Sequence, residues 1–336
     1  MPWIALGDWP TPLDAIEVDG RTLWVKREGD SAASYGGNKV RTLEAWLGHA
    51  RARGARRIWA IGAYGSNHAV ATVVHARAAQ LDAGAIVFPQ PASEWALENA
   101  GALVAARVPI VRLRSVLEVP FAALAVAARD RGGIVMPPGG ATPTGAFGAL
   151  SAAFELAEQI AAGAAPPPRT IVLAVGSTCT TAGLLAGFAA AHAVGAWRWP
   201  LPIVHAVRVT PWPVTSRASI VMLAARTLAR LAALGGPQVA GELGAHLAVD
   251  GRELGRGYGR MTASARAALA AISGPRLDGV YSAKAAAALL RLHRRGVGPL
   301  VFWATKSSAL AATPSRDALK AAPPALAKWL ARGATW

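Results

Sequence analysis

The sequence is short of cysteine. Its single cysteine, Cys179, excludes an intrachain disulfide and predicts a reducing compartment, which we take to be the cytoplasm. The opening residues, MPWIALGDWPTP, hold prolines and an acid where a signal peptide has a basic start and an apolar run. We therefore expect no secretion signal.

Acidic residues are also scarce. The 19 Asp and Glu residues face 35 Lys and Arg residues, which gives a net charge of +16. A basic surface can bind nucleic acid, and the segment Arg51–Arg57 is the densest basic cluster. The other arginines are spread along expected helices, without interleaved aromatic side chains or a nucleic-acid-binding motif. We predict a solvated basic surface that attracts small anions, and no nucleic-acid partner.

Charge is absent from one long stretch. Residues 170–197 contain no Asp, Glu, Lys or Arg, and such a stretch is long enough to cross a membrane. Its internal order differs from that of a membrane span, because an apolar β-prone run is followed by a polar loop and then by a helix-like run. This order predicts a buried strand, a loop and a helix in a soluble protein with no membrane partner.

Short apolar runs alternate with longer amphipathic segments. Apolar residues recur at helical spacing in Asn38–Ala52, and similar patterns predict helices at 66–81, 93–106, 118–131 and 144–162. The runs expected to form strands are 23–26, 57–61, 85–88, 110–113, 134–136, 170–175 and 203–209. Alternation of this kind predicts an α/β protein with a largely parallel sheet and helices on its faces. Beyond residue 210, Leu277–Tyr281 and Pro299–Trp303 are expected to be the last core elements.

The expected strand at 170–175 leads into the loop Gly176-Ser-Thr-Cys-Thr-Thr-Ala-Gly183. Backbone N–H groups and hydroxyls at a helix N-terminus bind anions, and this loop has the size for one phosphate. It has neither the Gly-Lys-Ser/Thr of a Walker loop nor a GxGxxG dinucleotide motif. An ordinary capped turn is the alternative interpretation, because Ser and Thr favour such positions.

A second polar turn, Gly62–His68, also lies between an expected strand and an expected helix. Its backbone N–H groups and the Asn67 amide can hold a carboxylate, which leaves the Ser66 hydroxyl facing a reacting atom. The alternative is a helix-capping Ser66 beside a His68 that is satisfied locally.

Lys39 follows Gly36-Gly37-Asn38 at the expected start of a helix. Burial and the positive helix end would favour its neutral amine, which can form a Schiff base. A solvent-exposed lysine is the simpler alternative for this residue alone. Taken together, a lysine, a carboxylate-binding turn and a monophosphate loop predict pyridoxal 5′-phosphate (PLP) as cofactor and an amino acid as substrate.

Several motifs occur in order between about residues 10 and 310: residues 10–13, 23–28, 36–44, 62–68, 138–148, 176–183 and 277–284. In these motifs the sequence resembles the D-cysteine desulfhydrase and 1-aminocyclopropane-1-carboxylate (ACC) deaminase group of fold type II, tryptophan-synthase-β-like PLP enzymes. The resemblance implies an α/β fold with two open, mostly parallel twisted sheets and helices on both faces. It also implies a homodimer without a metal. A larger PLP-binding domain (1–45 plus 155–336) and a smaller domain (46–154) that closes over the cofactor are expected.

The same resemblance implies roles for individual residues. Lys39 would carry the Schiff base, with Ser66 and Tyr281 as further catalytic groups. Ser66, Asn67, His68 and Tyr258 would contact the substrate. The cofactor would be held by Lys39, Asn67, Gly176, Ser177, Thr178, Cys179, Thr180, Thr181 and Thr305.

The chain departs from the family pattern at several positions. Ser282 stands where ACC deaminases have a glutamate, Ala304–Ser307 replaces a His-Thr-Gly-Gly segment, and Thr178 and Cys179 replace glycines. A hydroxyl partner such as Thr305 leaves the pyridine nitrogen largely unprotonated, which favours β-elimination. The sequence thus predicts a lyase or deaminase that converts a D-cysteine-like amino acid to a keto acid and ammonia. Racemisation, β-replacement, cyclopropane ring opening and a non-catalytic binding role remain alternatives.

Overall fold

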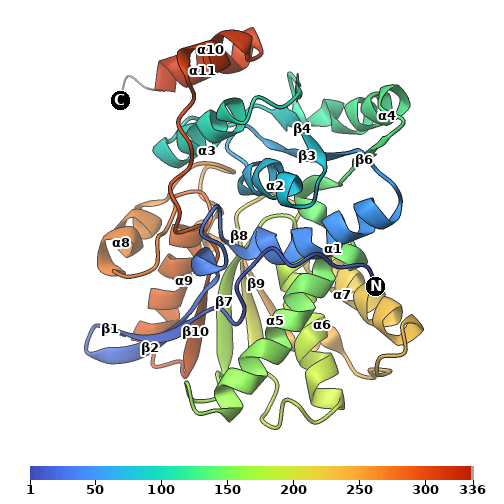
Figure 1. The fold of residues 1–336 in the computed structure, drawn as a ribbon. Helices are drawn as coiled ribbons and strands as arrows, with labels where there is room; N and C mark the ends of the chain where they lie inside the picture. The colour runs from blue at the N-terminus through green and yellow to red at the C-terminus, as the bar shows by residue number, and fades with distance from the viewer. Residues whose placement is uncertain (334–336) are drawn as a thin grey trace.

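A computed structural model of the chain describes residues 1–333, which form two β-sheets with helices on their faces. Figure 1 shows the larger sheet in the lower half of the molecule and the smaller sheet in the upper half. No helix among the described residues combines the length and the apolar character that crossing a membrane requires.

The larger sheet has six strands in the order β1-β2-β10-β7-β8-β9. Their bounds are Leu13–Val18 (β1), Arg21–Arg27 (β2), Leu300–Ala304 (β10), Thr170–Val175 (β7), Ile203–Arg208 (β8) and Leu247–Asp250 (β9). β1 and β2 form an antiparallel hairpin, and every other neighbouring pair is parallel. Alternate side chains of β7 enter separate cores, with Ile171 and Leu173 on one face and Val172 on the other. Both faces of the sheet are therefore buried.

The smaller sheet has four parallel strands in the order β5-β4-β3-β6. Their bounds are Ile110–Arg112 (β5), Asp82–Phe88 (β4), Arg57–Ala63 (β3) and Gly133–Val135 (β6). Ile58 and Ala60 face one core, and Trp59 and Ile61 face another. The parallel strands of this sheet thus carry apolar side chains toward both of its faces.

The helices that cover the sheets have the following bounds: Asn38–Ala52 (α1), Asn67–Ala78 (α2), Glu94–Ala105 (α3), Val119–Arg129 (α4), Pro143–Ala161 (α5), Cys179–Ala193 (α6), Arg217–Ala233 (α7), Ala263–Ala271 (α8), Ser282–Arg294 (α9), Arg316–Ala321 (α10) and Pro324–Gly333 (α11). Short 3₁₀ turns lie at Glu28–Asp30, Val116–Glu118, Pro138–Gly140, Leu243–His246 and Arg252–Leu254. A serine or threonine hydroxyl caps the N-terminus of α2, α3, α5, α7, α8 and α10. No side chain caps α1 or α6, which begin at two of the three segments singled out in the sequence, whereas Ser66 of the third segment caps α2.

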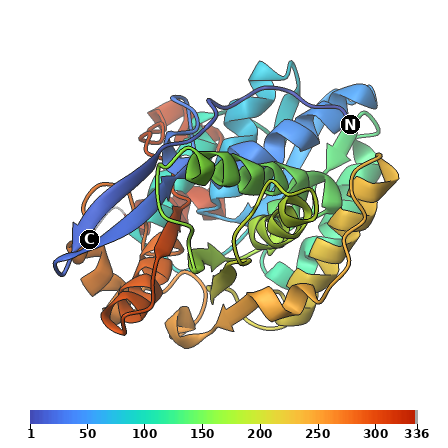
Figure 2. The same cartoon turned by 90° about the horizontal axis from the view of Figure 1, so that it is seen from below.

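Helices α5 and α6 lie side by side against the larger sheet (Figure 2). Their close approach depends on glycine, because a Cβ atom at Gly183 would lie 2.4 Å from the carbonyl oxygen of Ala146. A Cβ atom at Gly187 would lie 2.5 Å from the carbonyl oxygen of Leu150. This contact fixes where the N-terminus of α6 points.

The chain crosses between the sheets near its C-terminus. After β10, residues 305–315 lead to α10 and α11, which pack on α3 beside the smaller sheet (Figure 1). Leu326 and Leu330 of α11 join the same core as α1 and α2. The C-terminal helices thus pack beside the smaller sheet, and the domain limits predicted from the sequence stay a prediction.

Most elements expected from the sequence are present, and the parallel α/β class is confirmed. The predicted helix Asn38–Ala52 coincides with α1, and the other four expected helices overlap α2 to α5. Strands β1 and β9 were not predicted. Leu277–Tyr281 is buried as expected, but it forms turns, because Oδ1 of Asp278 accepts hydrogen bonds from the backbone N–H groups of Val280 (2.9 Å) and Tyr281 (2.7 Å).

A buried ionic cluster anchors the start of α1. The Arg41 guanidinium donates to both carboxylate oxygens of Glu28, at 2.7 and 2.9 Å, and to Oε1 of Glu155 at 2.9 Å. Lys26 also donates to Glu155. Arg41 is 3% exposed and Glu28 is fully buried, so each charge depends on its partners. Because Arg41 lies two residues after Lys39, the cluster also fixes the position of that lysine.

We predict that Arg41→Met lowers the free energy of unfolding by about 3–5 kcal/mol, because it leaves Glu28 buried without its cation. Urea denaturation of both proteins measures the difference. Arg294→Met is the matched control, since Arg294 pairs with Asp19 on the surface and its loss is expected to cost about 0.5 kcal/mol or less. Equal effects of the two substitutions would contradict this account of the cluster.

Candidate active site

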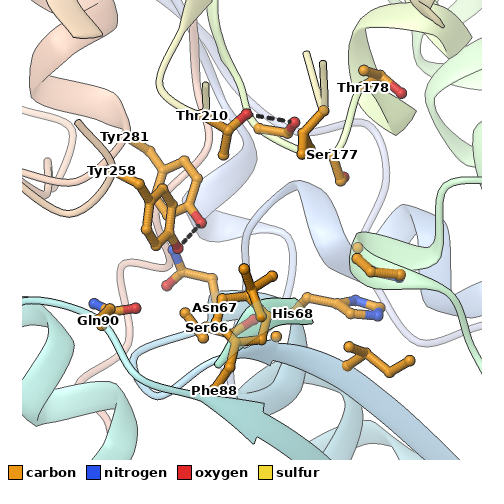
Figure 3. Close-up of a pocket in the computed structure, with 18 of the residues that line it drawn as sticks. Ser66, Asn67, His68, Phe88, Gln90, Ser177, Thr178, Thr210, Tyr258 and Tyr281 are labelled. Carbon is orange, nitrogen blue, oxygen red and sulfur yellow. Dashed lines mark hydrogen bonds between the residues drawn. The ribbon is translucent and has the colours of Figure 1, made fainter. Parts of the chain in front are cut away.

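A cavity of about 730 Å³ lies where strands of the two sheets end (Figure 3). Its wall includes the C-terminal ends of β3, β4 and β7 and the segment that follows β8. Ligands of open α/β sheets bind in this kind of place, beyond the carboxyl ends of the strands. All site residues predicted from the sequence line this one cavity: Lys39, Ser66, Asn67, His68, Gly176, Ser177, Thr178, Cys179, Thr180, Thr181, Tyr258, Tyr281 and Thr305. Their individual roles stay predictions.

Lys39 lies in the first turn of α1. Gly37, which precedes the helix, has a φ of 105°, and a Cβ atom there would lie 2.8 Å from the carbonyl oxygen of Thr305. This glycine therefore lets α1 begin against the end of β10. The Nζ atom of Lys39 is 3.3 Å from the Gly139 carbonyl oxygen and 3.4 Å from Oγ of Ser177. Burial lowers the pKa of the Lys39 amine, which favours the neutral form that forms a Schiff base.

The loop from β7 to α6 presents hydrogen-bond donors. Thr178 occupies the N-cap position but makes no capping hydrogen bond, so the first N–H groups of α6 are left for another acceptor. The Gly176 carbonyl oxygen accepts from the hydroxyls of Thr210 (3.0 Å) and Thr215 (2.6 Å), which fixes the loop. Asn38 Nδ2 donates to Oγ1 of Thr180 at 2.7 Å and ties the loop to the start of α1. This geometry favours the anion site over the ordinary capped turn.

Thr178 and Cys179, which stand where the family pattern has glycines, differ in their backbone and their contacts. Thr178 adopts left-handed backbone angles (φ 70°, ψ −20°), a conformation that suits glycine and strains a β-branched residue. Cys179 is fully buried, and its Sγ atom donates to the Gly140 carbonyl oxygen at 3.5 Å. Burial raises the pKa of the Cys179 thiol, so the thiol is held in its neutral form.

Asn67 is held by a network behind the cavity. Its Oδ1 atom accepts from the Tyr35 hydroxyl (2.9 Å), from Nδ2 of Asn99 (2.8 Å) and from Nζ of Lys306 (3.4 Å). With the oxygen occupied, the amide NH₂ group is left to donate into the cavity. Lys306 is not among the residues that line the cavity, and it supports Asn67 from behind.

Ser66 closes the same turn as the N-cap of α2. Its Oγ atom accepts from the backbone N–H of Ala69 at 3.2 Å, which is the capping role that the sequence left open. The hydroxyl proton of Ser66 remains available, and the side chain lines the cavity. Ser66 thus caps helix α2 and faces the cavity at the same time.

Two buried side chains of the cavity wall have polar atoms without a hydrogen-bond partner among the described residues. Both ring nitrogens of His68 and Nε2 of Gln90 are in this state, and burial lowers the pKa of His68 to about 3. His68 is therefore a neutral imidazole. Gln90 was not predicted from the sequence, because it follows Phe88-Pro89 in a segment without a recognisable motif. Unpartnered buried polar groups are rare in proteins and point to a missing ligand.

Tyr258 and Tyr281 form a hydroxyl pair in the cavity wall, with their oxygens 2.5 Å apart (Figure 3). Burial raises the pKa of Tyr258 to about 12 and that of Tyr281 well above its ordinary value. Both phenols thus keep their protons near pH 7, and one hydroxyl donates its hydrogen bond to the other. Next to Tyr281, the Ser282 hydroxyl donates to Oδ2 of Asp278 at 2.9 Å.

The described residues that line the cavity include Lys39 and Arg114 but no Asp or Glu. A cavity with positive charge and uncapped N–H groups suits an anion such as a phosphate or carboxylate. A sequence model of the family described as "Pyridoxal-phosphate dependent enzyme" matches residues 4–300. The chain belongs to the pyridoxal-phosphate dependent enzymes.

Relatives with curated names support this assignment. The chain is 36% identical over 198 residues to nocardicin C-9′ epimerase from Nocardia uniformis subsp. tsuyamanensis, covering 56% of the chain and 60% of that protein. It is 34% identical over 202 residues to a putative ACC deaminase from Pyrococcus abyssi, covering 57% and 60%. A D-cysteine desulfhydrase from Salmonella paratyphi C is 29% identical over 198 residues, covering 55% and 60%. The matches thus span about three fifths of each relative, and they confirm the resemblance to this group.

A solved structure, an ACC deaminase homologue, superposes with a TM-score of 0.73 at 26% identity and covers 91% of both chains. A threonine deaminase superposes with a TM-score of 0.58 at 18% identity, covering 89% of this chain and 92% of that one, and this match concerns the fold alone. The predicted fold, two mostly parallel sheets of a fold type II PLP enzyme, is confirmed.

The residues of this PLP-family site fit the cofactor. The uncapped N-terminus of α6 offers N–H groups to a phosphate, and the Lys39 amine lies on the same side of the cavity, 3.4 Å from Ser177 of that loop. A Cβ atom at Gly139 would lie 2.1 Å from the Ser177 hydroxyl and 3.4 Å from the Lys39 amine, so glycine keeps the space at this point open. The amine suits an aldehyde and the N–H groups suit a phosphate, which are the two groups that PLP carries.

We predict that Thr178→Gly raises the free energy of unfolding by up to about 1 kcal/mol, because relief of left-handed strain exceeds the extra chain entropy of glycine. Thermal and urea unfolding measure the change. Thr180→Gly is the matched control. It is expected to lower the free energy of unfolding, because it places a glycine inside helix α6 in place of a threonine. Destabilisation by both substitutions would contradict the assigned strain.

A pH dependence follows from His68. The unfolded chain protonates His68 near pH 6.5 and the folded chain only near pH 3, so between these values the unfolded state binds more protons and stability falls as the pH is lowered. We predict that between pH 6.5 and pH 4.5 the wild type loses about 2–3 kcal/mol more stability than His68→Gln. Urea titrations at both pH values test this, and the same loss in both proteins would show that His68 protonates normally.

Proposed function

We propose that the chain is a PLP-dependent lyase that releases a β-substituent from a D-cysteine-like amino acid and forms a keto acid and ammonia. The observation that carries the proposal is the meeting of Lys39 with the uncapped N-terminus of α6 in a cavity without a lining Asp or Glu. The similarity to D-cysteine desulfhydrase and to putative ACC deaminases supports the reaction class.

In this proposal Lys39 would hold the cofactor through its amine, and the N–H groups of α6 with the hydroxyls of Thr180 and Thr181 would hold the phosphate. Thr305, at the end of β10, would face the pyridine nitrogen. When bound, PLP withdraws electrons from the carbon that carries the substrate amine and thereby acidifies its proton. No lining carboxylate is available to protonate the ring, which agrees with elimination.

The substrate carboxylate would bind on the wall that faces the loop before α6. The Asn67 amide, held by the network behind it, donates into the cavity, and Gln90 Nε2 is a buried donor without a partner among the described residues. A carboxylate that accepts from both groups is oriented before reaction. The neutral imidazole of His68 adds no charge that would compete for this anion.

Two groups of this chain can then move protons. The Lys39 amine, whose pKa is lowered by burial, would accept the proton from the α-carbon of the substrate. Tyr281, whose proton is shared with Tyr258, donates to the leaving group. For cysteine, the balance is cysteine plus water to hydrogen sulfide, pyruvate and ammonia.

Epimerisation is a second candidate function. The 36% identity to nocardicin C-9′ epimerase favours it, and Lys39 and the tyrosine pair provide two separate proton-moving groups. Incubation of a substrate in D₂O distinguishes the two functions. Deuterium at the α-carbon with inversion supports epimerisation, whereas release of keto acid supports the lyase.

We also propose a cytoplasmic homodimer in which the domain 46–154 closes over the site. The resemblance to the family supports the dimer, and the single buried cysteine suits a reducing compartment. The position of the cavity between the two sheets supports closure, because relative motion of the sheets changes access of water to the reacting atoms.

The proposal predicts that the purified protein absorbs in the near-visible range and that Lys39→Ala abolishes both this band and the release of keto acid, by roughly a thousandfold or more. Absorbance spectra and a keto-acid assay measure the two effects. Lys320→Ala, which changes an exposed lysine of α10, is the control and is expected to keep both. A Lys39→Ala protein that retains the band would refute the assignment, and wild-type protein without a band would favour a non-catalytic role.

A further inference from the structure

The mouth of the cavity is apolar. Three separate segments contribute apolar residues to its wall there: the end of β4 and the turn after it (Phe88 and Pro91), the 3₁₀ turn before α4 and its first turn (Val116 and Pro120), and the segment after β8 (Pro211 and Val214). Val116 is 53% exposed and Val214 is 56% exposed, whereas Thr178, Thr180 and Thr181 at the phosphate loop are buried. The polar groups that suit the cofactor thus lie inside, and apolar groups border the opening.

Further exposed apolar residues are next in sequence to the residues of the mouth. Leu117 and Phe121 flank the α4 side, and Trp212 flanks the β8 side. Large apolar side chains at the surface are unfavourable in water unless a partner covers them, and they commonly mark ligand-binding grooves. Val116 and Val214 line the cavity itself, and this points to an apolar part of the substrate as the partner that covers them.

The size of the cavity agrees with this interpretation. PLP and a three-carbon amino acid together have about two dozen non-hydrogen atoms, and each occupies less than the roughly 30 Å³ of a liquid water when closely packed. The pair therefore leaves part of the 730 Å³ unfilled. A substrate as small as cysteine would not reach the apolar mouth.

The charge at the mouth narrows the class of substrate further. Arg114 lies on the wall beside Val116, and no Asp or Glu lines the cavity among the described residues. A cationic group at the end of the substrate would meet a like charge and find no counterion. The mouth therefore suits a neutral apolar group.

We infer that the site takes β-substituted alanines whose leaving group is a large neutral apolar group, such as an aryl or alkyl thiol. This inference rests on the proposed lyase function and defines its substrate. The reaction cleaves the bond between Cβ and sulfur. An S-substituted cysteine and water give the thiol, pyruvate and ammonia, without an oxidant or reductant.

Steady-state kinetics with both enantiomers of cysteine, S-benzylcysteine and S-(2-aminoethyl)cysteine test the inference. Burial of a benzyl group predicts a kcat/KM at least about tenfold higher than for cysteine, and the aminoethyl compound is expected to be the poorer of the two substituted substrates. Equal or lower kcat/KM for S-benzylcysteine, in an enzyme that turns over cysteine, would overturn the inference and leave the lyase function intact.

Substitutions locate the effect at the mouth. Val116→Glu and Val214→Glu place a charge among the apolar side chains. Each is expected to lower the ratio of kcat/KM for S-benzylcysteine to kcat/KM for cysteine at least about fivefold. Met222→Glu, on α7 and 59% exposed but outside the cavity wall, is the matched control and is expected to keep the ratio. Light scattering of the same variants tests the main alternative, which is that the apolar mouth is a contact surface between copies of the chain. A changed oligomeric state with an unchanged ratio would assign the apolar mouth to contact between copies and overturn the inference.

A binding measurement separates this inference from the reaction. The ligand 3-(benzylsulfanyl)propanoate has no amine and cannot react with the cofactor. Calorimetry with the PLP-loaded protein is expected to give a Kd at least about tenfold below that of propanoate, with the difference reduced in Val214→Glu. If the protein binds PLP but releases no keto acid, the lyase proposal fails while this result still supports the apolar subsite. Equal affinities for the two ligands would overturn the subsite.

Discussion

A buried lysine amine beside a helix N-terminus, with no carboxylate near it, is the constraint on which the site depends. Lys39 lies beside the uncapped N-terminus of α6, and the described cavity wall contains no Asp or Glu. A protonated amine here would be repelled by the positive helix end and would find no counterion among the described residues of the cavity wall, which agrees with the lowered pKa of the buried Lys39 amine. An anionic aldehyde would use both features, because its carbonyl group reacts with a neutral amine and its phosphate accepts from the free N–H groups of the helix. The family assignment names that cofactor.

The supporting structure lies outside the cavity. The buried Arg41–Glu28 pair fixes the start of α1, and Gly183 and Gly187 let α6 pack closely on α5, so the amine and the helix N-terminus meet at one place. On the other wall the Asn67 amide is oriented by residues from three other parts of the chain. The residues proposed to touch the ligand are thus positioned by contacts between elements far apart in the sequence.

The sequence predicted the loops that carry chemistry better than the parts that support them. Gly176–Gly183 and Gly62–His68 were recognisable because glycine, hydroxyl and amide residues follow apolar strands, and the structure places both at the cavity. Gln90 was missed because a lone glutamine after a strand has no distinctive pattern. The support that Lys306 gives to Asn67 was not predictable, since the two residues are 239 positions apart. Leu277–Tyr281 forms turns because the carboxylate of Asp278 binds its backbone, a choice that hydrophobicity does not report.

The central claim is that Lys39, and no other lysine, holds the cofactor. Reduction of the purified protein with borohydride, followed by proteolysis and mass spectrometry, fixes the cofactor to the amine that carries it. We expect the pyridoxyl phosphate group on the peptide that contains Lys39. Its attachment to Lys284 or Lys306, which are also buried, or its absence from every peptide, would contradict the account.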